Sequence, residues 1–227
     1  MHGTSRTRGR ASASCRRCRA RASARNGENV SARDEILKAL RAAAPQTVPL
    51  PDIGRVSAVR YPDVRERFAK SVVEVGGRCV LVEGPLEAAL AAIPEYAAAR
   101  KVVSLVPGVA KANVDLSSIG DPHDLRDVDF CVLPAELGVA ENGACWIVDH
   151  GGANRAAAFL TQHLAVVLRG DSLVHNLHEA YQRIAIPSPG FAMWLSGPSK
   201  TADIEQALVI GAHGARSCTV LVTAQAS

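Results

Sequence analysis

The stretch His163-Leu-Ala-Val-Val-Leu168 decides the fold. It is a continuous apolar run with no polar alternation, and it is too short for a helix. Such a run is typical of a strand that is covered on both faces of a parallel sheet. Short apolar runs of the same kind recur along the chain at Cys79–Val82, Lys101–Val106, Phe130–Leu133, Cys145–Val148 and Cys218–Val222. Helix-like stretches alternate with them, so we expect a three-layer α/β fold with a mainly parallel sheet.

The helix-like stretches begin and end at recognisable signals. Ser31 is a good N-cap for a helix over Ser31–Ala44, which Pro45 stops. Proline at the first position favours a second helix over Pro62–Ser71. Further helices are predicted at Pro85–Ala99, Asp171–Ile184 and Ala202–Val209, and further short strands at Val72–Val75 and Met193–Leu195.

The charge of this 227-residue chain is unevenly distributed. The formal net charge is +4, yet residues 1–29 carry eight arginines against the single acid Glu28, whereas residues 30–227 carry 18 basic against 21 acidic side chains. A nucleic-acid-binding body would carry its own basic face. We therefore expect no nucleic-acid binding by the folded part. The longest apolar runs are far shorter than the roughly 20 residues that cross a bilayer, so we also expect no membrane span.

Residues 1–29 are rich in Arg, Ser, Ala and Gly, a composition typical of disorder. Four interpretations stay open: a basic arm, an organelle transit peptide, a Cys15-x-x-Cys18 metal or redox motif, or an untranslated segment if the native chain starts near Val30. We expect residues 30–227 to form one α/β domain with an N-terminal helical appendage.

The other four cysteines lie in apolar, strand-like runs, at Cys79, Cys131, Cys145 and Cys218. We interpret them as buried thiols in a reducing, cytoplasmic environment.

Because ligands of open α/β sheets bind beyond the carboxyl ends of the strands, the segments that follow strands are the first candidates. The connection from Pro134 to Ala144 carries Glu136 and Glu141, each a candidate nucleophile or general base. Its Asn142-Gly143 pair equally predicts a tight hairpin turn with solvated glutamates. His150, farther on, is an acid/base group, a ligand or an ordinary loop histidine.

A second candidate follows the predicted strand Met193–Leu195. Ser199, Lys200 and Thr201, with the amides of a helix start, would hold a phosphate or carboxylate, and His213 would close over the same crevice. Asp203 and Glu205 in that first turn would instead stabilise the helix dipole themselves and repel an anion, so a plain capped helix is the alternative.

These residues carry a family resemblance. The run Ser196-Gly-Pro-Ser-Lys-Thr-Ala-Asp-Ile-Glu205, followed by Leu208-Val-Ile-Gly-Ala-His213-Gly214, resembles the C-terminal signature of the LUD-domain family, lactate-utilisation protein C type. Glu141-Asn-Gly-Ala144 is similar to the family's Glu-Thr-Gly-Thr segment, although Asn142 and Ala144 depart from it. The resemblance covers roughly residues 60–225.

The resemblance implies a fold similar to the ribose-phosphate isomerase, glucosamine-phosphate deaminase and coenzyme A transferase group. It also implies a role in oxidising L-lactate to pyruvate with iron–sulfur partner subunits. This chain has neither the spaced cysteines of a cluster nor a GxGxxG turn, so we expect no cofactor on it and iron–sulfur clusters on the partners.

Three hypotheses follow. The first is an accessory or substrate-handling subunit that binds a small carboxylate or phosphate-bearing ligand. Its catalytic candidates are Glu141, Glu136 and His213, and its ligand-binding candidates are Gly143, Ser196, Gly197, Ser199, Lys200, Thr201, Asp203 and Gly214. The second is a stand-alone transferase or ligase-like enzyme in which Glu136 or Glu141 forms an acyl intermediate. The third is a structural module without a ligand.

Overall fold

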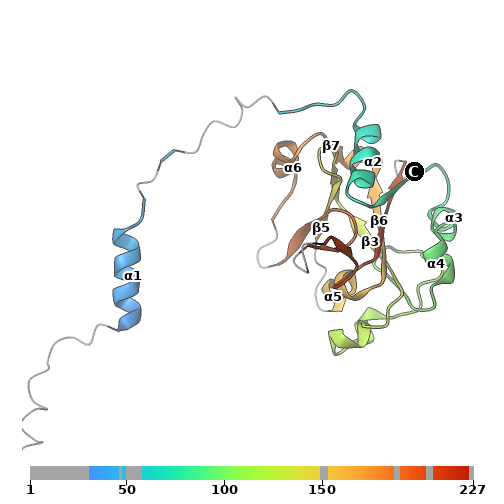
Figure 1. Cartoon of the computed structure of the whole chain (residues 1–227). Helices are drawn as coiled ribbons and strands as arrows, with labels where there is room; N and C mark the ends of the chain where they lie inside the picture. The colour runs from blue at the N-terminus through green and yellow to red at the C-terminus, as the bar shows by residue number, and fades with distance from the viewer. Residues whose placement is uncertain are drawn as a thin grey trace, which may run out of the picture. The chain divides into compact units, whose positions relative to one another are not determined.

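The computed structural model describes residues 31–45, 48–49, 58–148, 153–186, 190–202 and 207–224. The chain divides into two units, Met1–Ile53 and Gly54–Ser227. The first contains helix α1 (Ala32–Ala42; blue in Figure 1). Ser31 caps it as predicted, since its hydroxyl accepts from the Asp34 amide while the Asp34 carboxylate accepts from the Ser31 amide and hydroxyl. The predicted basic tail, residues 1–29, lies outside the described residues.

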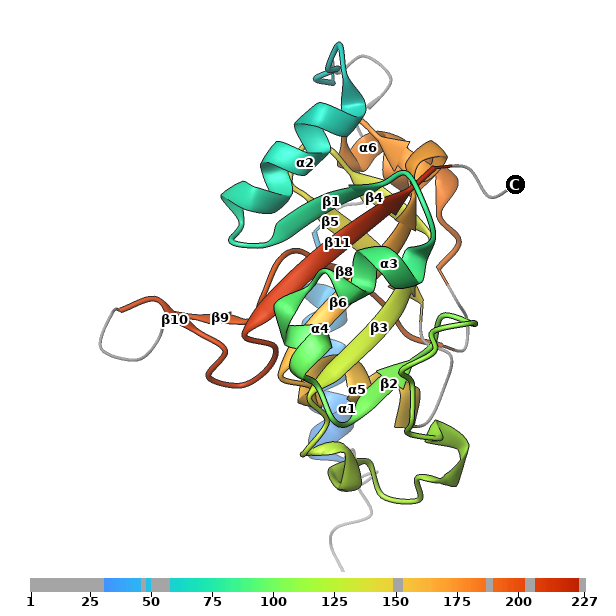
Figure 2. The ribbon, with the colours of Figure 1, turned by 90° about the vertical axis from the view of Figure 1, so that its right-hand side faces the viewer.

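A five-stranded parallel sheet forms the centre of the second unit. Its strands lie in the order β1 (Arg78–Val82), β11 (Ser217–Thr223), β6 (His163–Arg169), β3 (Phe130–Ala135) and β2 (Val102–Ser104). Every pairing within it is parallel. Figure 2 shows the strands side by side. The prediction made from the continuous apolar runs is confirmed.

Both faces of this sheet are covered. Helices α3 (Leu86–Ala91) and α4 (Pro94–Ala98) pack on one face, where Leu90 and Tyr96 meet the strand residues Phe130 and Leu221. Helices α2 (Val64–Glu74) and α5 (Ala153–Leu160) cover the other face, together with a second sheet. Consecutive residues of a strand point to opposite faces, which explains why the central strands are apolar throughout.

The second sheet contains β7 (Leu173–Val174), β4 (Leu137–Val139), β5 (Ala144–Val148) and β8 (Ala192–Leu195). Strand β5 pairs antiparallel with both β4 and β8. The Asn142-Gly143 turn joins β4 to β5, so the predicted hairpin is confirmed, and Gly143 adopts the positive φ of 66° that such a turn requires. Helix α6 (Leu177–Arg183) packs on the outer face of this sheet.

Two predicted helices are shorter than expected. Pro85–Ala99 is divided into α3 and α4, because Pro94 opens a new helix. Within Asp171–Ile184 only α6 is helical. Its N-cap is Asn176, whose side chain accepts from the Glu179 amide, and β7 precedes it. Three 3₁₀ turns lie at Leu116–Ser118, Pro122–Leu125 and Gly170–Ser172.

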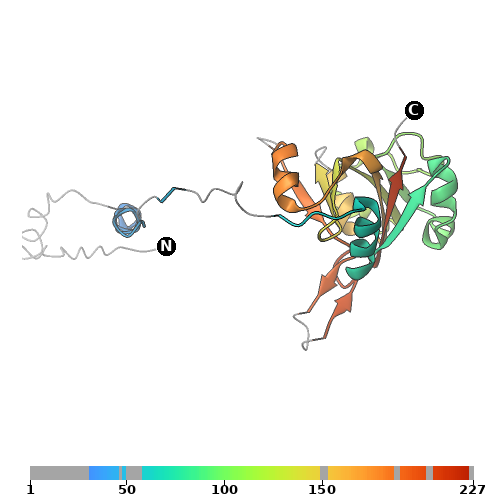
Figure 3. The ribbon, with the colours of Figure 1, turned by 90° about the horizontal axis from the view of Figure 1, so that it is seen from above.

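Two further predictions of local structure are wrong. Val72–Val75, predicted as a strand, is the end of α2 and its C-cap, since Phe68 and Val72 are buried at helical spacing. The helix predicted over Ala202–Val209 is contradicted by a hairpin of β9 (Lys200–Thr201) and β10 (Val209–Ile210), which pair antiparallel. Residues 203–206 lie outside the described residues. The hairpin extends away from the rest of the second unit (Figure 3).

Candidate functional site

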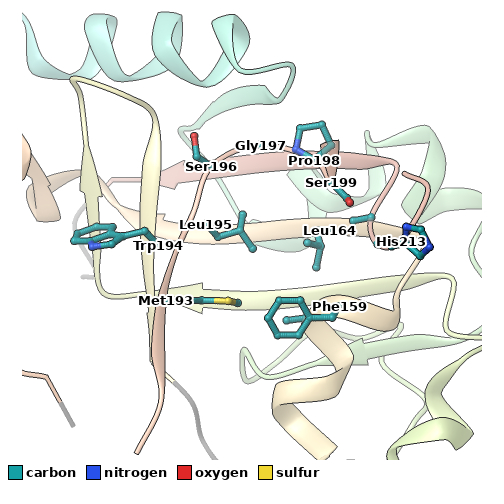
Figure 4. Close-up of a pocket in the computed structure, with 13 residues that line it drawn as sticks. Phe159, Leu164, Met193, Trp194, Leu195, Ser196, Gly197, Pro198, Ser199 and His213 are labelled. Carbon is teal, nitrogen blue, oxygen red and sulfur yellow. The ribbon is translucent and has the colours of Figure 1, made fainter. Parts of the chain in front are cut away.

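A cavity of about 260 Å³ lies between β8, the turn that follows it, the end of α5 and the segment His213–Ala215. Its walls are mostly apolar, formed by Phe159, Leu164, Met193 and Leu195. Figure 4 shows the side chains of Met193 and Leu195 extending from β8 on one side, while the Trp194 ring points the opposite way. We call it the inner cavity.

The inner cavity lies at the amino ends of the central strands. Leu164 is the second residue of β6, and Ala215 precedes β11 by two residues. The sequence predicted a site at the carboxyl ends of these strands. The second sheet explains why the cavity lies at the amino ends instead. Strand β8 brings its own carboxyl end to this edge, where the Ser199 amide donates to the Ala215 carbonyl at 2.9 Å.

Two polar side chains of the cavity have no partner within the described part of the chain: the Ser199 hydroxyl and the His213 imidazole. Both lie at the end of the cavity away from Trp194 (Figure 4). Gly214 leaves room for the hydroxyl, because a Cβ at position 214 would lie 3.2 Å from Ser199 Oγ. His213 is exposed. The sequence predicted these three residues together, and the structure brings them together.

The other residues of the signature mainly support the turn. The Ser196 hydroxyl donates to the Asn142 carbonyl at 3.0 Å. Gly197 has φ +71°, and a Cβ there would lie 2.6 Å from the Val75 carbonyl oxygen. The Lys200 ammonium donates to that same Val75 oxygen at 2.6 Å. Val75 is the C-cap of α2, so Lys200 places a positive charge at the negative end of the helix dipole.

Gly143 and Thr201 occupy structural positions as well. A Cβ on Gly143 would lie 2.8 Å from the Val72 backbone nitrogen, so α2 rests directly on this turn. The buried Ser71 hydroxyl reinforces the contact by donating to the Ala140 carbonyl at 2.6 Å. Thr201 pairs with Val209 in the hairpin. Asp203 and His150 lie outside the described residues.

The two glutamates are not part of the inner cavity. Glu136 is exposed and follows β3. The last residue of β3, Ala135, pairs with Leu168, four residues beyond Leu164 in β6. At about 3.3 Å per residue, this places Ala135 about 13 Å from the level of Leu164, and Glu136 about 17 Å from it, towards the carboxyl end of the sheet. The exposed Glu141 accepts from the Leu177 amide at 3.2 Å and does not line the cavity.

The apolar wall of the cavity was not predicted. Leu164 and Ala215 are ordinary core residues in the sequence, and Phe159 follows an alanine run. Only the period-two placement of Met193 and Leu195 on β8 hinted that both face the same side.

The described cysteines are thiols held in the sheets. Burial raises the pKa of Cys79 to about 11 and those of Cys131 and Cys218 to about 12, and it raises that of Cys145 well above its usual value.

Within the described ranges, no group of three His, Cys, Asp or Glu side chains is arranged to hold a metal ion. Nor does any helix among those residues have the length and apolar character needed to cross a bilayer.

The geometry defines an α/β domain with a small cavity at a glycine- and serine-rich turn. Residues 122–223, somewhat less than half of the chain, match the LUD domain family model. The resemblance expected from the signature residues is confirmed.

Similar curated proteins are named "Lactate utilization protein C". The protein of Shouchella clausii is 28% identical over 100 residues, 41% of this chain and 44% of that protein. The one of Deinococcus radiodurans is 30% identical over 103 residues, 44% of this chain and 48% of its own. A third, from a Geobacillus strain, is 24% identical over 201 residues, which are 83% of this chain and 78% of that protein. The chain thus spans about half the length of the first relatives it matches.

The crystal structure of a DUF162 family protein from Deinococcus radiodurans has a similar fold. The TM-score is 0.56 at 18% sequence identity, and the match covers 73% of this chain and 99% of that one. This likeness concerns the arrangement of the backbone. It agrees with the mainly parallel α/β sheet described above.

Proposed function

We propose that this protein acts in lactate utilisation, as a substrate-handling or accessory subunit that holds a small 2-hydroxy or 2-oxo carboxylate in the inner cavity. The proposal rests on the position of the Ser199 hydroxyl and the His213 imidazole beside the apolar walls of the inner cavity, since neither group has a partner among the described residues. The names of the relatives supply the substrate class.

The cavity suits such a ligand chemically. The Ser199 hydroxyl donates to one carboxylate oxygen, and an imidazole N–H of His213 donates to the other or to the C2 oxygen. The methyl group of lactate rests against Leu164 and Leu195. A charged acceptor makes each hydrogen bond worth about 1.5–3 kcal/mol.

Electrons removed from lactate pass to another protein in this proposal. Iron–sulfur clusters, which would accept these electrons, need sets of spaced cysteine thiolates. Burial opposes thiolate formation at the four described cysteines, which lie on separate strands. We therefore place the iron–sulfur clusters on partner subunits of a cytoplasmic complex. Recovery of iron-containing partners with this protein from lactate-grown cells tests that part.

The transferase-like alternative has less support. It needs Glu136 or Glu141 as a nucleophile beside the signature turn. The strand register places Glu136 towards the opposite end of the sheet, and the carboxylate of Glu141 accepts from the Leu177 amide. A structural module without a ligand would leave the Ser199 hydroxyl and the His213 imidazole without a role.

Calorimetric titration of the full chain with L-lactate and with pyruvate tests ligand binding. We expect the Ser199→Ala and His213→Ala variants each to weaken binding about tenfold, since each removes one hydrogen bond to a charged group. Neither side chain has a hydrogen-bond partner in the described protein, so the thermal midpoint should stay unchanged.

Glu136→Gln is the matched control, because it changes a carboxylate at the other end of the sheet, and its affinity should equal that of the unmodified protein. Absence of saturable binding of both carboxylates would overturn the proposal. Equal affinities for the Ser199→Ala variant and the unmodified protein would do so too.

A further inference from the structure

A second cavity, of about 370 Å³, lies beside β8 on the outer side of the second sheet. Four aromatic residues line it: Trp146, Tyr181, Phe191 and Trp194. The chain contains nine aromatic residues and two tryptophans, so four of the nine and both tryptophans gather here. We call it the aromatic cavity. Met193 and Trp194 of β8 border both cavities, but Tyr181, Ile186 and Phe191 line only the aromatic cavity.

The strand register builds its floor. Trp146 of β5 and Trp194 of β8 are directly paired, and their ring centroids lie 4.8 Å apart at 51°. Tyr181 of α6 meets Trp194 edge-on at 6.0 Å, and its hydroxyl oxygen accepts from Trp194 Nε1 at 3.2 Å. The indole ring of Trp194 is therefore fixed from both sides. Such rigid rings bind a flat ligand with little loss of conformational entropy.

The other indole group is left without a partner. Trp146 is 5% exposed, and its buried Nε1 has no hydrogen-bond acceptor among the described residues. A buried tryptophan N–H normally finds an acceptor, because burial without one loses its hydrogen bond to water with nothing in return. This N–H is therefore poised to donate to an acceptor supplied from outside the chain.

The outer wall of the cavity is accessible. Tyr181 is 55% exposed and Ile186 is 72% exposed, although both are large side chains beside an apolar hollow. A ligand that enters beside Tyr181 and Ile186 would bury this apolar surface. The exposure of these two side chains thus marks the entrance, while the two tryptophans form the base.

We propose that the aromatic cavity binds a planar heteroaromatic ring that carries a hydrogen-bond acceptor. The ring packs against the aromatic lining of the cavity, and a ring carbonyl or ring nitrogen accepts from Trp146 Nε1. Contact between a planar ring and aromatic side chains is favourable for any heteroaromatic base, and a cavity of this size suits a bicyclic or tricyclic ring. The ligand class is that of flavins and purine nucleotides.

Tryptophan fluorescence reports directly on the cavity because both tryptophans of the chain line it. Titration of the full chain with FMN and with AMP should give saturable quenching by at least one of them. Trp146→Phe keeps an aromatic ring but removes the donor, and we expect it to weaken binding about tenfold by calorimetry. Tyr181→Ala, at an exposed position, should weaken binding without loss of fold.

Ser199→Ala is the control at the inner cavity and should leave ring binding unchanged. The proposal is overturned if neither FMN nor AMP binds saturably. It is also overturned if Tyr181→Ala binds as tightly as the unmodified protein, or if a folded Trp146→Phe variant does. Since lactate binding is measured separately with Ser199→Ala and His213→Ala, failure here is distinguishable from failure of the proposed function.

Discussion

The two ends of the central sheet differ in what their polar side chains do. At the carboxyl end, Arg169 pairs with Asp171 and Glu136 is exposed to solvent. At the amino end, β8 delivers the signature turn, and the Ser199 hydroxyl and the His213 imidazole have no partner among the described residues. The rule that ligands bind beyond the carboxyl ends of parallel strands therefore does not predict the candidate site, because β8 of the second sheet brings the signature turn to the amino end.

The amino end also depends on packing that the carboxyl end does not need. The carboxyl end of α2 rests on Gly143, Gly197 and Lys200, which together hold the signature turn in place. Substitutions can therefore separate the residues that build this end from those proposed to bind a ligand there.

The largest expected effect is that of Gly143→Ala. The added methyl group meets the Val72 backbone nitrogen at 2.8 Å, and alanine disfavours a φ of +66°. We expect a loss of about 3 kcal/mol in the free energy of unfolding, measured by urea denaturation. Gly84→Ala is the control, since nothing lies within 4 Å of a Cβ there. Equal stability of the two variants would show that the contact between α2 and the turn is dispensable.

A smaller effect is expected for Lys200→Met. The ammonium caps the end of α2 through the Val75 carbonyl, so its loss should cost about 1 kcal/mol of unfolding free energy and leave lactate affinity unchanged. Lys101→Met, which removes an exposed ion pair with Asp127, should leave the free energy of unfolding nearly unchanged, because solvent screens such a pair. Unchanged stability with lost lactate binding would instead make Lys200 an anion contact.

The smallest effect is a pH dependence at His163, the first residue of β6. Burial lowers the pKa of this imidazole below 6.5, partly offset by Glu95, whereas Arg216 and Arg78 lower it further and Asp129 raises it. The unfolded chain then binds the proton more readily, so stability falls as pH drops below about 6.5.

This His163 contribution is measured as the change in urea midpoint between pH 7.5 and 5.5. The slope should be shallower in His163→Gln, whose side chain retains a hydrogen-bonding group near Ser217. An identical slope in both proteins would remove His163 as the cause.

Much of the fold was predictable because the central strands are buried on both faces. A parallel sheet is predicted by the continuous apolar runs at His163–Leu168 and Cys218–Val222. The pairing of β9 with β10 was not predictable from local signals, because the sequence Ser199–Glu205 is also typical of a capped helix. The strand at Lys200–Thr201 depends on the pairing of Thr201 with Val209. The signature residues Ser199, His213 and Gly214 were located by pattern, whereas the apolar wall depends on long-range packing.

Strand β8 is a partition between two compartments. Because successive side chains of a strand alternate, Met193 and Leu195 extend into one cavity while Trp194 extends towards the other. A slip of one residue in the pairing of β8 with β5 would reverse this assignment, placing an indole in the inner cavity and removing Trp194 from the floor of the outer one. Both cavities therefore depend on the same register of β8 against β5, and a one-residue slip would disrupt both at once.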